Sequence, residues 1–152
     1  GAVSEQYNKN ALKFAFTRCP YDRAISLFSY LKQHRKIDVE LEFESFLELV
    51  HRKRPPIGMN HGVSLSQANP QIDWLTGVDG ELLVDQLFKF EEMKVFEKFL
   101  TEQFGLSVSM KERKNQSHRL LDVAELTQRH TARELIELIY ARDFDALNYP
   151  RL

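Results

Sequence analysis

Apolar residues gather in two short runs that are typical of strands buried in a sheet. The first run covers Leu12–Thr17 and the second covers Glu81–Leu87. The second contains Leu82-Leu83-Val84, and a continuous apolar run of this kind fits a sheet that is covered on both faces. Predicted helices separate the two runs, and a helical connection favours parallel strands. The pattern therefore predicts an α/β fold with a few parallel strands inside a helix-rich chain.

Elsewhere apolar residues recur every three or four positions, which is the period of one face of an α-helix. This period predicts helices over Tyr21–Lys36, Asp38–Arg54, Phe90–Phe104 and Thr131–Phe144. Gly105 follows the third helix at the position where a glycine commonly ends one, and Phe96, Phe99 and Phe104 are expected in the core. Thr131 and Glu134 have the spacing of a capping box that begins the last helix.

Residues 55–80 show little periodicity and predict a long loop of the kind that is often functional. The basic residues 51–54 before it indicate a solvated helix end, with a patch for an acidic acceptor as the alternative. The acidic pair Asp143 and Asp145 lies in a predicted helix, where charged side chains usually face solvent.

Composition narrows the class of protein. With 43% hydrophobic and 28% charged residues, the 152-residue chain is expected to form a single domain. A net charge of −1 gives no indication of nucleic-acid binding. Cys19 is the only cysteine, and the sequence has no pattern of a membrane helix, a signal peptide, a metal site or a serine-hydrolase elbow. We therefore expect a cytoplasmic protein that binds neither metal nor membrane.

The most informative chemistry lies where the first predicted strand meets the first predicted helix. Arg18 follows the strand, and Pro20 falls in the first helical turn, where its missing N–H has no partner to lose. Asp22 complements the helix dipole, and Ser26 follows one turn later. A guanidinium and a hydroxyl at a strand end suit an anionic ligand such as a phosphate ester. A surface arginine beside an ordinary helical serine is the alternative.

The order of these residues, Arg-x-Pro-Tyr-Asp-Arg-x-x-Ser over 18–26, resembles the 3′-phosphate-binding segment of the carbohydrate-type and bacterial sulfotransferases. These enzymes use 3′-phosphoadenosine-5′-phosphosulfate (PAPS). Further segments resemble parts of the same family in the same order. They are the Pro-Gln stretch at 69–75, the strand and turn at 82–91, Asn115-Gln116-Ser117, and the closing helix at 140–149.

The resemblance implies a P-loop-like sulfotransferase fold, with PAPS as the sulfuryl donor and a hydroxyl-bearing acceptor as the second substrate. It implies that Arg18 and Ser26 hold the 3′-phosphate of the nucleotide and that Asn115 and Ser117 approach the same ligand. It also suggests His61 as an acceptor-binding residue and general base, although His61 lies further from the Pro-Gln segment than the family's histidine does.

The family's 5′-phosphosulfate loop, which carries a lysine, has no counterpart in this sequence. We therefore expect residues 1–152 to be the C-terminal portion of a sulfotransferase domain that lacks the N-terminal strand, loop and helix. The chain would then act as an enzyme only with that part, which either belongs to a longer protein or comes from a separate partner segment. An exposed sheet edge could also lead to self-association. The catalytic base stays unassigned. The alternative function is a non-catalytic helical interaction or regulatory module derived from the same fold.

Overall fold

The computed structural model describes residues 11–54, 65–109 and 119–152, which divide into two compact units. The first unit contains residues 11–17 and 73–109, and the second contains residues 18–54, 65–72 and 119–152. Strands are found in the first unit, and the second unit is helical over the residues described.

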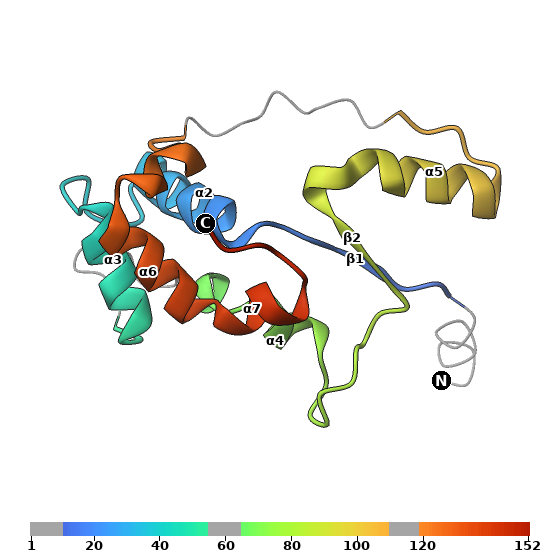
Figure 1. The fold of residues 1–152 in the computed structure, drawn as a ribbon, viewed down its shortest axis with the longest axis horizontal. Coiled ribbons are helices and arrows are strands. Elements are labelled where there is room, and N and C mark those ends of the chain that lie inside the picture. Colours follow the sequence, from blue (N-terminus) through green and yellow to red (C-terminus); the bar gives the residue numbers. More distant parts are fainter. Residues whose placement is uncertain (1–10, 55–64, 110–118) are drawn as a thin grey trace. The chain divides into compact units, whose positions relative to one another are not determined.

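The first unit is built on two parallel strands, β1 (Phe14–Thr17) and β2 (Gln86–Lys89), which lie side by side (Figure 1). Phe16 pairs with Phe88 in the register of the sheet. The α/β class and the parallel pairing predicted from the sequence are both confirmed. A short 3₁₀ turn, η2 (Phe90–Glu92), leads from β2 into α5 (Met93–Phe104), and Gly105 ends this helix with a positive φ of 63°.

Aromatic rings join α5 to the sheet. The ring of Phe96 lies 4.7 Å from that of Phe16 and 4.9 Å from that of Phe88, measured between centroids. Phe99 also contacts Phe88, at 5.0 Å. Contacts between these rings stabilise a unit with few strands, with Phe88 and Phe96 buried and Phe16 37% exposed. The predicted core role of Phe96 is confirmed, and Phe99 is half-buried. The core role predicted for Phe104 is wrong, since this residue lies in the last turn of α5 and is 53% exposed.

The second strand lies further along the chain than predicted. Leu82 and Leu83 are 52% and 51% exposed and do not belong to β2. The reason is a tight turn, in which Gly80 has a φ of +76° and its N–H donates to the carbonyl of Gly77 at 3.0 Å. The chain folds back after this turn, so that Leu82 forms an antiparallel bridge with Thr76. Pairing with β1 begins only near residue 85.

The second unit packs helices from both ends of its sequence against each other. Its elements are α2 (Pro20–Gln33), α3 (Phe43–His51), η1 (Leu65–Ala68), the start of α4 (Ile72–Leu75), η3 (Val123–Thr127), α6 (His130–Ile139) and α7 (Ala141–Ala146). Helix α3 lies along α6, and α2 also contacts α6 (Figure 1). The apolar side chains buried here include Tyr21, Ile25, Phe28, Phe43, Phe46, Leu47, Leu126, Ile136 and Phe144.

The bounds of all four predicted helices differ from those in the structure, and the second and the last differ most. Helix α3 begins at Phe43 because the Asp38 side chain accepts the N–H of Glu40 at 2.9 Å, which stabilises a turn instead of a helix. The last predicted helix is two helices, α6 and α7, which meet at Tyr140. Its predicted capping box is wrong, since Arg129 is the N-cap of α6.

The capping box lies earlier in the chain. Asp122 precedes η3, and its N–H donates to the Glu125 carboxylate at 3.3 Å. The long loop predicted over residues 55–80 is also shorter than expected, because residues 65–68 and 72–75 are helical. Among the residues described, no helix is both long enough and apolar enough to cross a membrane.

Candidate functional site

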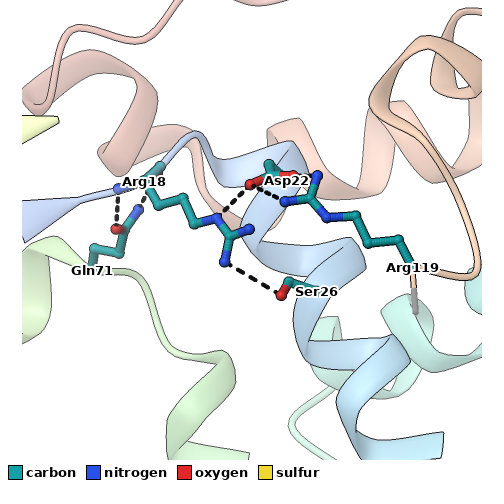
Figure 2. A network of polar contacts seen from close by, with 5 residues as sticks. All are labelled: Arg18, Asp22, Ser26, Gln71 and Arg119. Carbon is teal, nitrogen blue, oxygen red and sulfur yellow. Dashed lines mark hydrogen bonds and ion pairs between the residues drawn. The ribbon is translucent and has the colours of Figure 1, made fainter. Parts of the chain in front are cut away.

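Arg18 lies at the start of the second unit, directly before α2, and its side chain runs along that helix (Figure 2). Nη1 of Arg18 donates to Oγ of Ser26 at 3.3 Å, and Nε donates to the carboxylate of Asp22. Asp22 and Ser26 are four residues apart and share one face of α2, and the side chain of Arg18, which precedes the helix, reaches both of them. The structure thus places the two residues predicted to bind the 3′-phosphate, Arg18 and Ser26, side by side.

A second guanidinium belongs to the same cluster. Arg119 forms an ion pair with Asp22, so that this carboxylate lies between two arginines (Figure 2). The position of Arg119 is fixed by the next residue, because the N–H of Leu120 donates to the buried Ser29 hydroxyl at 3.1 Å. Sequence reasoning missed Arg119, since nothing in its own neighbourhood indicates a contact with a residue 97 positions away.

We call Arg18, Asp22, Ser26 and Arg119 the guanidinium cluster. Two arginines and one aspartate give it a net charge of +1. The side chains of Arg18 and Arg119 are 26% and 30% exposed, so both can meet a ligand from solvent while part of each is shielded from water. Guanidinium donors beside a hydroxyl suit the oxygens of a phosphate or sulfate group. Among the described residues, no group of histidine, cysteine or acidic side chains could hold a metal ion.

Gln71 fixes the backbone on which Arg18 is carried. Its Oε1 accepts the N–H of Arg18 and its Nε2 donates to the carbonyl of Arg18, both at 2.8 Å (Figure 2). Both backbone polar groups of Arg18 therefore have a partner in one side chain. Gln71 belongs to the Pro-Gln stretch noted in the sequence, and the structure brings that stretch to the arginine of the first motif.

Asp143 lies behind Gln71 and is fully buried, at 0% exposure. It accepts the backbone N–H of Gln71 at 2.8 Å and that of Ile72 at 2.9 Å. The expectation that the acidic pair of α7 faces solvent is therefore wrong for Asp143 and right for Asp145, which is exposed. The physical reason is that Asp143 supplies the acceptor for N–H groups at the start of α4, which no residue within that helix can satisfy.

The segment before Gln71 is bound to α2 and α6. The Arg23 guanidinium donates to the carbonyls of Gln67 and Asn69, at 2.8 and 2.9 Å. The Tyr140 hydroxyl donates to the carbonyl of Ala68 at 2.8 Å. Burial raises the pKa of Tyr140 to about 12, so the phenol keeps its proton at neutral pH and remains a donor.

The other sequence-predicted site residues lie outside the described residues. They are His61, Asn115 and Ser117. Cys19 is half-buried and is the N-cap of α2, and its carbonyl accepts the N–H of Arg23 at 2.9 Å. The basic residues 51–54 are exposed, as expected of a solvated helix end.

Fold and site together define an α/β protein with a pair of parallel strands, a helical second unit and a guanidinium cluster where the first strand leads into a helix. The model of the sulfotransferase family matches residues 2–150. The match spans nearly the whole chain, and the protein therefore belongs to the sulfotransferase family. No curated protein and no solved structure gives a significant match.

Proposed function

We propose that this chain supplies the 3′-phosphate-binding segment of a sulfotransferase that moves a sulfuryl group from PAPS to an acceptor hydroxyl. The observation that carries the proposal is the contact of 3.3 Å between Nη1 of Arg18 and Oγ of Ser26, at the junction of a strand and a helix. Family membership supports a sulfuryl donor and an acceptor in general terms. The choice of PAPS and the assignment of the 3′-phosphate to Arg18 belong to the proposal.

Guanidinium and hydroxyl groups match the oxygens of a phosphate monoester. Arg18 would donate hydrogen bonds from its terminal nitrogens, and the Ser26 hydroxyl would donate another. The fixed backbone of Arg18 reduces the freedom that the side chain loses on binding. In this scheme Asn115 and Ser117 reach the same nucleotide, and His61 lies near the acceptor.

Binding a 3′-phosphate orients the nucleotide but does little for the chemical step, because the 3′-phosphate is bound equally in the ground state and the transition state. Acceleration needs groups that neutralise charge at the transferring sulfuryl group and at the leaving phosphate. We propose that these groups come from a segment outside the 152 residues, since the sequence has no lysine-bearing loop of the expected kind. Incubation of the chain with labelled PAPS and a panel of hydroxyl acceptors should then give no turnover.

Titration calorimetry with adenosine 3′,5′-bisphosphate and adenosine 5′-monophosphate tests the binding claim. The bisphosphate should bind more tightly, and Arg18→Ala should weaken its binding by about 1.5–3 kcal/mol, which is typical of a hydrogen bond to a charged group. Arg52→Ala is the matched control, because Arg52 forms an exposed ion pair with Glu48 at 3.4 Å on α3. Equal affinity of the wild-type chain for the two nucleotides would contradict the proposed site.

A further inference from the structure

We propose that Gln71 is a positioning residue for Arg18 and that the buried Asp143 holds it in place. The three residues come from segments far apart in the sequence and form a continuous chain of hydrogen bonds inside the second unit. The inference rests on the proposed function, because it gives these contacts a role in selecting nucleotides that carry a 3′-phosphate.

Gln71 contacts Arg18 through its side-chain amide, and the groups of Arg18 that take part are those of the backbone. Both N–H and carbonyl of Arg18 pair with the same amide, each at 2.8 Å. Two parallel hydrogen bonds fix orientation as well as distance, so the direction in which the Arg18 side chain leaves the backbone is set by Gln71. The Arg18 side chain then donates hydrogen bonds to Asp22 and Ser26, which both lie on α2.

Asp143 fixes Gln71 at the other end. Its Oδ2 accepts the backbone N–H of Gln71 at 2.8 Å and lies 3.5 Å from Nε2, and its Oδ1 accepts the N–H of Ile72 at 2.9 Å. Burial of a carboxylate costs free energy unless the carboxylate is hydrogen-bonded. Here the fully buried Asp143 carboxylate accepts hydrogen bonds from two backbone N–H groups. Asp143 thus fixes the backbone of Gln71, and the side-chain amide of Gln71 pairs with the backbone of Arg18.

A role confined to stability predicts something different from a positioning role. If Gln71 and Asp143 only stabilise the fold, then a folded variant should keep its preference for the bisphosphate. If they position Arg18, then the preference should fall even in a variant that remains folded. The preference is measured as the ratio of the dissociation constants of adenosine 5′-monophosphate and adenosine 3′,5′-bisphosphate.

The experiment compares the full chain with the variants Gln71→Met and Asp143→Asn. Methionine has a similar length to glutamine and cannot form hydrogen bonds with the Arg18 backbone. Asp143→Asn keeps the Gln71 side chain and weakens the hydrogen bonds that the residue-143 side chain accepts from the backbone of Gln71 and Ile72. Each variant should lower the ratio by about tenfold while its circular dichroism and cooperative unfolding stay those of a folded protein. Asp145→Asn is the matched control, because it removes an exposed carboxylate from the same helix and should leave the ratio unchanged.

Coupling to Arg18 provides the second measurement. In an Arg18→Ala background, Gln71→Met should have no further effect on the ratio, since the group that it positions has gone. A wild-type chain with no preference for the bisphosphate would overturn the proposed function. The positioning role alone would be overturned if the folded Gln71→Met variant kept the wild-type preference. It would also be overturned if Gln71→Met lowered the ratio equally in the wild-type and Arg18→Ala backgrounds. If Gln71→Met does not fold, the same comparison is decided by Asp143→Asn.

Discussion

Asp22 lies between the guanidinium groups of Arg18 and Arg119, and replacing it with asparagine should change stability and ligand affinity in opposite directions. The variant loses two ion pairs, so the free energy of unfolding should fall. It also raises the net charge of the guanidinium cluster from +1 to +2, so an anion should bind more tightly. An asparagine oxygen can still accept a hydrogen bond from one arginine, which keeps the geometry of the cluster close to that of the wild type.

The magnitudes follow from burial and distance. The Asp22 side chain is 13% exposed and its partners are 26% and 30% exposed, so the two pairs lie between surface and buried pairs in strength. We expect a loss of about 1–3 kcal/mol in the free energy of unfolding. A phosphate held beyond the Arg18 guanidinium would lie roughly 7 Å from the Asp22 carboxylate. Coulomb repulsion between unit charges at that distance is about 0.6 kcal/mol in water and about 2.4 kcal/mol at an effective dielectric constant of 20.

These values convert to an affinity gain between about threefold and about fiftyfold for adenosine 3′,5′-bisphosphate, measured by calorimetry at low salt. Urea unfolding of the same samples gives the stability. Asp145→Asn is the control, since it changes the net charge of the chain equally but removes an exposed carboxylate that pairs with Arg151 at 2.9 Å. Weaker binding by the folded Asp22→Asn variant would refute the reasoning, because it would mean that Asp22 acts mainly by orienting Arg18.

Further predictions concern the other charged and phenolic groups. Arg119→Ala should weaken bisphosphate binding about three- to tenfold and reduce its salt dependence, measured by calorimetry at several salt concentrations. The Arg129 guanidinium donates to both oxygens of Glu44 and lowers the pKa of that carboxyl. Glu44→Gln should therefore cost about 1 kcal/mol of stability at neutral pH, and chemical unfolding should show this difference shrinking as the pH falls below about 4.5. Burial, and then the hydrogen bond to Glu137, raise the pKa of Tyr21 to about 12. Wild-type stability should thus fall as the pH rises from about 10 to about 12, and Tyr21→Phe should reduce that fall, as followed by urea unfolding at each pH.

The parts of the fold that the sequence predicts correctly depend on local spacing. Arg18 and Ser26 meet because Asp22 and Ser26 share one face of the helix that Pro20 begins, and Arg18 lies just before the start of that helix. The parallel pairing of the strands follows from the helical connection between them. The apolar run at Leu82 and Leu83 predicts a strand too early in the chain, because the run alone does not show that a glycine turn precedes it and bends the chain back.

The parts that the sequence does not predict depend on contacts between distant segments. The sequence pattern around Asp143 is that of a solvent-facing residue. Its burial is explained by the backbone N–H groups of Gln71 and Ile72, which donate hydrogen bonds to its carboxylate. Arg119 and Asp22 are separated by 97 positions. Hydrophobic periodicity locates faces of helices, but it does not reveal which polar groups of other segments will lie opposite each of them.

The segment Arg-x-Pro-Tyr-Asp-Arg-x-x-Ser has two sets of positions that face different surroundings. Arg18, Asp22 and Ser26 meet at the guanidinium cluster, whereas Arg23 and Tyr21 contact the body of the second unit. Arg23 donates to the carbonyls of residues 67 and 69, and the Tyr21 hydroxyl accepts the N–H of Leu152 at 2.9 Å. One short sequence can combine these roles because each helical residue turns the side-chain direction by about 100°. Under the proposed function, substitutions in the first set should therefore change ligand affinity, whereas those in the second set should act mainly on the stability of the second unit.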